Sequence, residues 1–260
     1  MSEASPLFIT LDTIAAHTWP AESVDYVDNW LLRSSQGVTR RANSVLAIGD
    51  FPKDADWLAQ IELYYQKRGL PAVIQVSAAS PENLDEQLSA AGYALETPCL
   101  LMTADSQEVV DRTAISLAKR ENTDIQIEWT PEAAEEWLDA FLRLEQFPEE
   151  RRSFYLHLFE RMPISKGFFT LSQHGKMIAL GTAIVEKQWS GFVNVVVHEE
   201  HRGKGLGYML MHAMTSWSMK QGATQQYLQV ITSNAAAVAL YGKLGYTTCY
   251  GYHYRIKYDL

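Results

Sequence analysis

The chain has 260 residues, 47% of them hydrophobic, so it can bury one large core or the cores of two domains. Its formal net charge of −9 at pH 7 argues against nucleic acid or an anionic membrane as the main partner, although a local basic spot can still bind a small anion. With only two cysteines, Cys99 and Cys249, the chain cannot build a disulfide framework or a zinc site with four cysteine ligands.

The first half of the chain contains few clear elements. Its N-terminal sequence MSEASPLFIT has neither the cationic start nor the long apolar core of a signal peptide, and no run of about 18 apolar residues follows. We therefore expect a cytoplasmic protein without a membrane segment. Residues 39–45 predict a strand that carries Arg40 and Arg41 either on a solvated face or at an interdomain substrate cleft. The charged, poorly periodic stretch 104–123 predicts a junction between two domains.

The second half predicts a regular succession of helices and strands. Thr130 is the expected N-cap of a helix with Pro131 in its first turn, and a second helix covers about 150–161. Three strands are predicted by the apolar runs 167–171, 177–185 and 192–197. A helix with apolar residues on one face then begins at Leu206 and ends near Gly222.

The end of the chain predicts a strand, a helix and a last strand. The first strand spans 227–231, and the helix places Tyr241 on an apolar face before it stops at Gly245. Alternation puts four aromatic residues on one face of the last strand: Tyr250, Tyr252, Tyr254 and Tyr258. These tyrosines either pack against the core or form a wall of a substrate pocket.

Two segments of the chain share one plan. Residues 66–93 and 219–246 each contain a pair of glycines 23 positions apart, since 92 − 69 and 245 − 222 both equal 23. This internal similarity predicts two related domains, 1–115 and 122–260, with chance similarity between two helix-strand-helix units as the alternative. The first copy has Pro52 where the second has a glycine-rich loop, so we expect the first copy to have lost its site.

That loop is the strongest functional signal in the sequence. HRGKGLGY, residues 201–208, places three glycines and two cations between a predicted strand and a predicted helix. Backbone N–H groups at such a turn, together with the positive end of the helix dipole, form a cradle for a phosphate group, and Arg202 and Lys204 add positive charge. The P-loop pattern is absent, and the dinucleotide pattern G-x-G-x-x-G fails because Tyr208 replaces its last glycine.

The pattern R-x-x-G-x-G at 202–207 resembles the acyl-CoA pyrophosphate loop of the GNAT superfamily of acetyl-CoA-dependent N-acetyltransferases. The resemblance continues through Asn234 and through ALYGKLGY, residues 239–246, and it covers 122–260. The first half resembles the same fold with a degenerate loop, as in tandem members of the superfamily. The resemblance implies an α/β fold of the α+β type, with two tandem GNAT-like domains. Each would be a mixed, mostly antiparallel, twisted sheet flanked by helices, and the C-terminal domain would be complete.

The same resemblance implies acetyl-CoA as the acyl donor and a primary amine, of a small molecule or a protein, as the acceptor. Its implied binding residues are Val195, Val197, Arg202, Gly203, Lys204, Gly205, Leu206, Gly207 and Asn234. The amine would attack the thioester directly, and Tyr241 matches the general acid that protonates the departing thiolate. From periodicity alone, Tyr241 is equally well a core residue. A binding module that holds acyl-CoA without turnover, as a sensor or scaffold, is the alternative function, and a nucleotide-dependent enzyme is a second one.

The residue that removes the proton of the amine stays unassigned in the sequence. Glu145, Glu186 and Asn194, which could hold a water, are the candidates, and each of them also suits a surface or structural position. The sequence His198-Glu199-Glu200-His201 suggests a metal site, but its histidines are three positions apart, whereas the helical zinc motif needs four. We therefore expect no metal.

Overall fold

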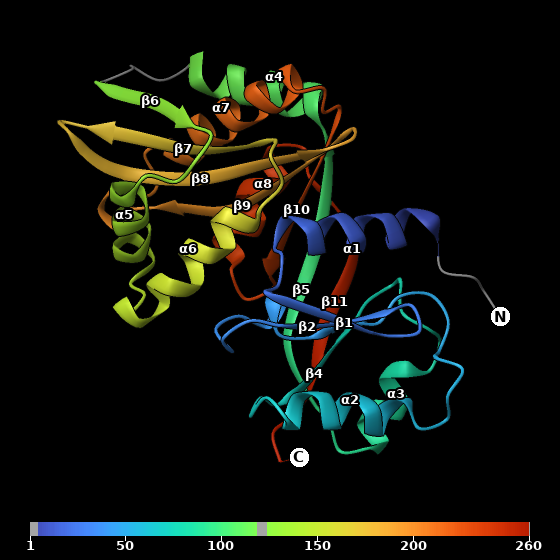
Figure 1. The fold of residues 1–260 in the computed structure, drawn as a ribbon. Coiled ribbons are helices and arrows are strands. Elements are labelled where there is room, and N and C mark those ends of the chain that lie inside the picture. Colours follow the sequence, from blue (N-terminus) through green and yellow to red (C-terminus); the bar gives the residue numbers. More distant parts are fainter. Residues whose placement is uncertain (1–4, 119–123, 260) are drawn as a thin grey trace. The chain divides into compact units, whose positions relative to one another are not determined.

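The computed structural model describes residues 5–118 and 124–259 and divides into two compact units (Figure 1). The first unit takes in the chain up to residue 100, residues 231–233 and the end of the chain from residue 250. The second unit takes in residues 101–118, 124–230 and 234–249. The last strand of the sequence therefore has residues in both units.

The first unit consists of strands and helices, built mainly from the N-terminal half of the chain. Its elements are α1 (Pro6–Thr18), β1 (Ser23–Val27), β2 (Trp30–Ser34), η1 (Arg40–Ala42), β3 (Val45–Leu46), α2 (Trp57–Gln66), β4 (Ala72–Val76) and α3 (Leu84–Ala90). Residues of β5 (Ala94–Asp105) and β11 (Thr247–Lys257) complete it. β3 and β4 pair in parallel, whereas the pairs β1–β2, β2–β3 and β4–β11 are antiparallel.

Burial explains why these segments fold as they do. All five residues of β4 are buried, as in a strand covered on both faces, and α2 buries Trp57, Ile61 and Tyr65 at helical spacing. The tyrosines of β11 at 250, 252 and 254 are buried, which confirms their packing role, whereas Tyr258 is 61% exposed. Arg40 and Arg41 lie in the short helix η1, so the strand predicted for 39–45 is wrong; the strand begins at Val45.

A polar cluster lies inside the first unit. The carboxylate of Asp12, on α1, accepts hydrogen bonds from Ser77 Oγ at 2.5 Å, Tyr250 Oη at 2.8 Å and Gln75 Nε2 at 3.4 Å. Gln75 Oε1 accepts in turn from Arg33 Nη2 at 3.4 Å. Burial raises the pKa of Asp12 and lowers that of Arg33. Because each charge would be costly alone, the bridge through Gln75 makes the two groups interdependent.

Ion pairs join β11 to α3 within the first unit. Asp85, on α3, accepts from Arg255 Nε at 2.7 Å and Nη2 at 3.0 Å, and its Oδ1 lies 2.6 Å from His253 Nε2. The hydrogen bonds from Arg255 lower the pKa of Asp85 from 3.8 to about 2, against a smaller desolvation effect that would raise it.

We expect Asp85→Asn to destabilise the protein by at most about 1 kcal/mol at neutral pH, because the carboxylate is 40% exposed and surface ion pairs are weak. A carboxylate with a lowered folded-state pKa stabilises the fold fully above its unfolded pKa of 3.8 and loses this effect as the pH falls through about 2. Thermal melting of both proteins from pH 7 down to pH 2 measures the difference. A gap between the two midpoints that stays constant over this range would contradict the assignment.

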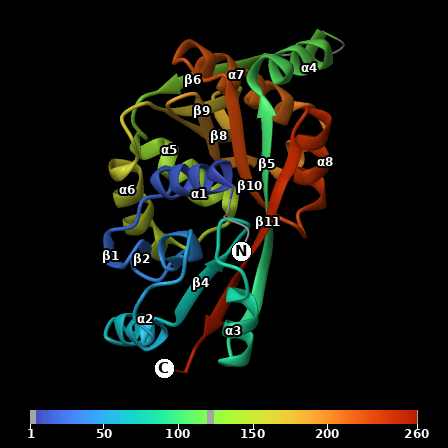
Figure 2. The same cartoon turned by 90° about the vertical axis from the view of Figure 1, so that its right-hand side faces the viewer.

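The second unit carries the elements that the glycine-rich loop joins (Figure 2). Besides its parts of β5 and β11 it contains α4 (Ser106–Ala118), β6 (Ile125–Thr130), α5 (Glu135–Glu145), η2 (Glu149–Arg151), α6 (Arg152–Arg161), β7 (Lys166–Gln173), β8 (Lys176–Glu186), β9 (Trp189–Val197), η3 (Glu199–His201), α7 (Leu206–Lys220), α8 (Ala235–Lys243) and all but the last residue of β10 (Gln225–Ile231). The strand order is β10-β9-β8-β7-β6. Only β9 and β10 pair in parallel among these neighbours.

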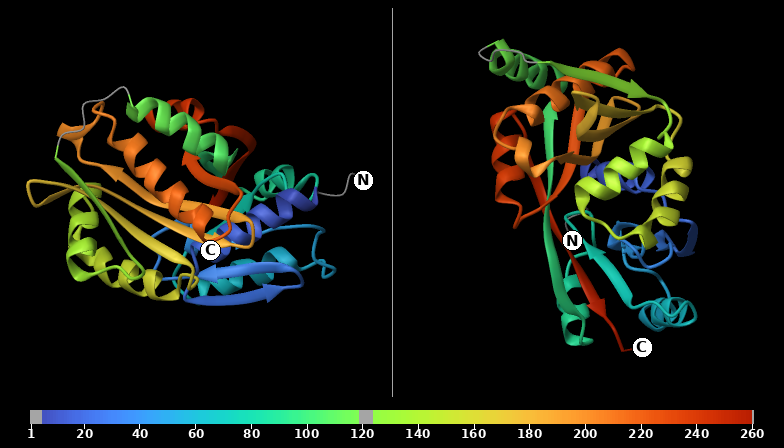
Figure 3. Two further views of the ribbon diagram at one scale, coloured as in Figure 1. Left: turned by 90° about the horizontal axis from the view of Figure 1, so that it is seen from above. Right: turned by 90° about the vertical axis from the view of Figure 1, so that its left-hand side faces the viewer.

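Helices cover both faces of this sheet, with α4 and α7 on one side and α5 and α6 on the other (Figures 1 and 3). Two neighbouring residues of β7 show why. Phe168 meets Trp137 of α5 with ring centroids 5.1 Å apart, whereas Phe169 meets Trp217 of α7 at 5.9 Å. Because successive side chains of a strand point to opposite faces, this pair of phenylalanines joins both helical layers to the sheet.

Two boundaries differ from the sequence prediction. The helix α5 begins at Glu135 with Ala134 as its N-cap, and Thr130 instead ends the strand β6, so the predicted N-cap is wrong. In the stretch 104–123, residues 104–105 end β5, and α4 follows up to residue 118 and packs on α7; residues 119–123 lie outside the described residues. Only a narrow side of α4 is buried, which explains why its sequence shows so little apolar periodicity.

Candidate active site

The parallel strands β9 and β10 part halfway along their length. Their register runs from Trp189 opposite Gln225 to Phe192 opposite Leu228 and ends there. In the same region the pairing of β9 with β8 shifts register, and Asn194 adopts a positive φ of 56°, as in a β-bulge. Beyond this point the main-chain N–H and C=O groups of β9 that face β10 have no strand partner in β10. A ligand can form hydrogen bonds with them.

The glycine-rich loop follows directly after β9 and η3. Gly203 and Gly205 have φ values of +76° and +90°, a region that residues with a side chain rarely adopt. Gly205 is the N-cap of α7 and supplies no side-chain cap, so the first N–H groups of this helix point toward the space in front of it. Arg202 folds back on the strand, and its Nε donates to Val197 O at 3.1 Å.

At Gly207 close packing, rather than a positive φ, favours glycine. A Cβ atom at this position would lie 2.9 Å from Leu240 Cδ2, so the missing side chain lets the start of α7 approach α8 closely. On α8, Asn234 acts as the N-cap, because its Oδ1 accepts from the N–H of Ala237 at 3.2 Å. The loop, α7 and α8 thus form one connected wall.

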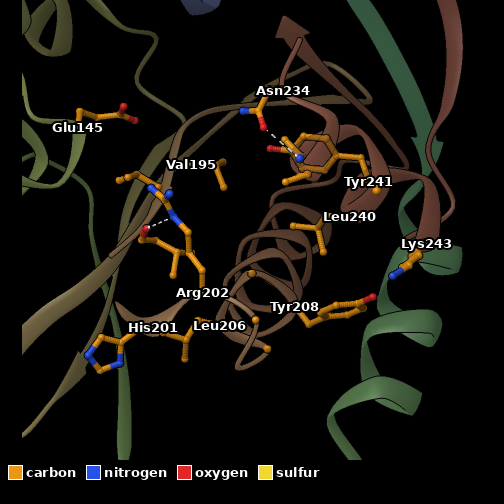
Figure 4. Close-up of a pocket in the computed structure, with 18 residues that line it drawn as sticks. Glu145, Val195, His201, Arg202, Leu206, Tyr208, Asn234, Leu240, Tyr241 and Lys243 are labelled. Atoms are coloured by element: carbon orange, nitrogen blue, oxygen red, sulfur yellow. Dashed lines mark hydrogen bonds between the residues drawn. The ribbon is translucent and has the colours of Figure 1, made fainter. Parts of the chain in front are cut away.

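The strand end, the loop and α8 enclose a cavity of about 580 Å³ (Figure 4). Nine of the ten predicted site residues line it: Val195, Val197, Arg202, Gly203, Gly205, Leu206, Gly207, Asn234 and Tyr241. Lys204 is exposed and is not among the lining residues. Sequence reasoning missed Val196, His201, Tyr208, Ala236, Ala237, Ala239, Leu240 and Lys243, which also line the cavity. A search for residues next to the loop and on the Tyr241 face of α8 would have found most of them.

Tyr241 is a buried residue of this wall, 8% exposed, and its ring packs beside that of Tyr246 at 5.7 Å. Burial raises its pKa to about 12, because the phenolate would lose its hydration. The hydroxyl therefore stays protonated throughout the physiological range. A neutral phenol on a cavity wall can donate a hydrogen bond or a proton to a group that becomes negative.

Of the three candidate bases, only Glu145 lines the cavity. Asn194 is buried, and its Nδ2 donates to Thr182 Oγ1 at 3.1 Å, which gives it a structural role at the bulge. Glu186 ends β8 and is not among the lining residues. Burial raises the pKa of Glu145, while the positive charge of Arg202 opposes this shift.

The histidines before the loop form a turn. His198 Nδ1 accepts from the N–H of Glu200 at 3.3 Å, and its ring meets that of His201 edge-on at 5.6 Å. Within residues 5–118 and 124–259, no three His, Cys, Asp or Glu side chains are grouped so that they could hold a metal ion. Over the same residues, no helix combines the length and the apolar character that crossing a membrane requires.

Comparison with known proteins identifies the family of the chain. The sequence matches, over residues 9–258, the family described as "Probable histone acetyltransferase Rv0428c C-terminal". The chain belongs to this acetyltransferase family. It is 40% identical over 247 residues to the "Uncharacterized N-acetyltransferase YobR" of Bacillus subtilis, a match that covers 95% of this chain and 97% of that protein. The chain is therefore an N-acetyltransferase and an acyltransferase enzyme.

Other similarities are narrower or concern the fold. A ribosomal protein bS18-alanine N-acetyltransferase of Escherichia coli is 36% identical to this acetyltransferase over 78 residues, which are 30% of this chain and 53% of that protein. A GCN5-related N-acetyltransferase from Kribbella flavida has a similar structure, with a TM-score of 0.71 and 14% identity over 99% of this chain and 97% of that chain. A tandem GNAT protein from the clavulanic acid biosynthesis pathway gives a TM-score of 0.64 at 13% identity, over 95% and 87%. The acetyltransferase has the GNAT fold.

Proposed function

We propose that this N-acetyltransferase takes its acetyl group from acetyl-CoA and that the cavity of Figure 4 is the place of transfer. The support is the combination of two parted parallel strands with a glycine cradle at a helix N-terminus, both lining one cavity. Such a cradle suits the diphosphate of coenzyme A, because it offers backbone N–H groups and the positive end of the dipole of α7. Bound there, acetyl-CoA supplies an acetyl thioester as the electrophile.

The residues of the cavity divide the work by chemistry. The main chain of β9 at Val195 and Val197 would bind the pantetheine arm, as a neighbouring strand would. Arg202 and the glycines up to Gly207 would hold the diphosphate. Lys204 would act only from outside the cavity, as an exposed positive charge. Asn234 contributes mainly by capping α8, which carries Tyr241.

Tyr241 would protonate the thiolate that leaves. With a pKa of about 12, the buried Tyr241 is a weaker acid than a free thiol, whose pKa is ~8.5. Transfer of its proton to a thiolate with that ordinary pKa would therefore be uphill. However, the thiolate would form beside the same apolar wall, and burial raises the pKa of a thiol as it does that of a phenol. The difference in acidity between the two groups at the site is therefore smaller than the values of about 12 and ~8.5 suggest.

The acceptor is proposed to be a primary amine of a small molecule or of a protein. The bS18-alanine N-acetyltransferase of E. coli, by its name, acts on an alanine of a ribosomal protein, and the family description names a histone acetyltransferase. Both descriptions name a protein as the acceptor. The net charge of −9 fits an acceptor that arrives with a positive charge.

We also propose that the first half of the chain is a degenerate copy of the second, with domains 1–115 and 122–260. In support, α2, β4 and α3 follow one another as α7, β10 and α8 do. The parallel pair β3–β4 corresponds to β9–β10, and Gly92 and Gly245 follow the two last helices with φ of +84° and +99°. Leu88, fully buried, would occupy the place of Tyr241, so the first copy would have no acid.

The test is a thermal-shift titration followed by a turnover assay. A ligand at 100 times its dissociation constant adds about 2.7 kcal/mol to stability, so coenzyme A should stabilise the protein while NAD and ATP should not. Release of free thiol from acetyl-CoA in the presence of peptides, polyamines or amino acids would then show transfer. Binding without release across all amines would favour the sensor or scaffold function instead.

The cradle itself can be tested at Gly205. We expect Gly205→Ala to cost about 1–3 kcal/mol of stability, because φ is +90° there, and to weaken binding of coenzyme A. Gly242→Ala is the matched control, since this glycine of α8 has open space around its Cβ position, and alanine should be neutral or stabilising. Thermal melting with and without coenzyme A measures both effects. Equal affinity in Gly205→Ala and the wild type would remove the support for the cradle.

A further inference from the structure

Glu145 occupies a special position in the cavity. It is the last residue of α5, and the following Gln146 has a left-handed φ of 55° that ends the helix. The helix packs on β8 and β9, which brings its C-terminal end to the parted part of β9. Figure 4 shows the carboxylate directed toward Val195 and Arg202, on the side of the cavity away from Lys243. Among the described residues that line the cavity, it is the only carboxylate.

The groups around Glu145 set its charge. The other titratable residues of the cavity wall are Arg202, His201, Tyr208, Tyr241 and Lys243. On the neighbouring helix α6, Arg152 is engaged with Asp139 and Glu149. Of all these groups, Arg202 acts on the carboxylate by its charge, and burial acts in the opposite direction and more strongly. A diphosphate bound in the cradle would engage Arg202. The pKa of Glu145 would then rise further, because the positive charge that opposes the effect of burial would be neutralised.

We propose that Glu145 receives the acceptor's ammonium group and removes the proton that blocks its attack. This inference rests on the proposed function. An aliphatic amine with a pKa near 10.4 is neutral in only about one molecule in 2,500 at pH 7, so a base is needed. A carboxylate serves twice, because it attracts the ammonium group and then accepts its proton.

The protons balance over one cycle. Glu145 takes the first proton from the ammonium group, and the neutral nitrogen attacks the thioester carbonyl. The new C–N bond forms as the C–S bond breaks, and Tyr241 gives its proton to the leaving thiolate. The second proton lost by the nitrogen restores Tyr241, and Glu145 returns its own proton to solvent. The products are an amide, free coenzyme A and one released proton.

The position of Glu145 also restricts the acceptor. A half-buried carboxylate favours one positive charge and repels an anionic group next to the reacting nitrogen. We therefore expect amines without a neighbouring carboxylate or phosphate, such as the N-terminus of a peptide or a lysine side chain. Free amino acids, whose carboxylate lies beside the amine, should be poor acceptors.

The first experiment needs no acceptor. The carboxyl carbon of Glu145 is followed by ¹³C NMR in protein labelled at glutamate, and the resonance is assigned by its loss in Glu145→Gln. We expect it to titrate above the ordinary glutamate value of ~4.3 and to move higher when coenzyme A is added. Titration at the ordinary value in both states would overturn the proposal.

The second experiment compares two acceptors of different basicity, alanyl-glycinamide and Nα-acetyl-lysinamide. Glu145→Gln should lower kcat/KM by about 10²–10⁴-fold for the lysine amine and by less for the α-amine, whose pKa is only ~7.7–8.0. Its rate should rise in proportion to the neutral amine as the pH increases. Glu186→Gln, at the other glutamate considered, should behave like the wild type. An equal effect of Glu145→Gln on both amines, or none, would overturn the proposal.

These outcomes are separable from failure of the proposed function. If coenzyme A gives no thermal shift in the wild-type protein, the cradle assignment fails, whereas the NMR titration still reports on Glu145. Conversely, a thermal shift retained in Glu145→Gln shows that this variant is folded and binds coenzyme A, so that its lost rate belongs to the chemistry.

Discussion

Replacing Tyr241 by phenylalanine is expected to lower kcat and kcat/KM for acetyl transfer by about 10²–10⁴-fold while the affinity for coenzyme A stays unchanged. The substitution removes one hydroxyl from a side chain that is 8% exposed and leaves the ring in place. Equal losses in kcat and kcat/KM, with unchanged affinity for coenzyme A, therefore mean that the hydroxyl acts in the transition state and not in binding. Steady-state thiol release and a thermal-shift titration with coenzyme A measure the two quantities.

The control is the neighbouring Tyr246, whose ring lies 5.7 Å from that of Tyr241. Its hydroxyl donates to Gln226 Oε1 at 2.5 Å, and it is not among the residues that line the cavity. Tyr246→Phe should lower stability by about 1 kcal/mol and keep the wild-type rate. If Tyr241→Phe retained the wild-type rate as well, Tyr241 would be a packing residue, which its periodicity on α8 also allows.

The wild-type rate should not fall with pH because of Tyr241 below about pH 12. A general acid must be protonated, so its contribution is present below its pKa and is lost as the pH rises through it. If the pH–rate profile falls near neutral pH, another titrating group must be responsible. The direction of the pH dependence separates Tyr241 from Glu145. Glu145 acts as a base, so its titration would make the rate rise with pH.

The elements with the clearest apolar periodicity were predictable, because an element buried on one face repeats its apolar residues at regular intervals. The strands β7, β8 and β9 and the helix α7 lie where apolar runs placed them. The strand β6 was missed, although Ile125, Ile127 and Trp129 alternate, because its edge position leaves most of its residues exposed. The helix α4 was missed because it buries only Ser106, Val109 and Thr113, so its sequence shows little apolar periodicity. Sequence patterns report buried faces, and both elements bury little.

The site was predictable where it is local in sequence and not where the fold assembles it. The loop from Arg202 to Gly207 and Tyr241 belong to two contiguous motifs, and the structure places both in one cavity. Glu145 is 57 positions before the first of them, since 202 − 145 is 57, and no motif connects it to the loop. Its entry into the cavity depends on how α5 packs on β9. For Lys204 the motif predicts a place in the site, but this residue is not among those that line the cavity.

Stability of the first unit should depend strongly on Arg33. We expect Arg33→Met to lower the free energy of unfolding by about 3–5 kcal/mol, because Gln75 links the buried guanidinium to the buried carboxylate of Asp12, and removing one charge leaves the other without compensation. Arg33 is 4% exposed, and its Nε and Nη2 donate to Ser44 O at 3.1 Å and Ser44 Oγ at 2.8 Å. Methionine fills a similar volume but offers no donor, so Asp12 loses the positive charge that Gln75 links to it. Urea unfolding measures the change.

Arg152→Met is the matched control, because it makes the same chemical change at a partly exposed ion pair on α6. Arg152 contacts Asp139 and Glu149, and its side chain is 32% exposed. Exposed ion pairs contribute little to stability, so this variant should unfold close to the wild type. Similar losses in both variants would contradict the role of burial. A further change, Asp12→Asn in the Arg33→Met background, should recover part of the lost stability, since it removes the carboxylate that Arg33 no longer compensates.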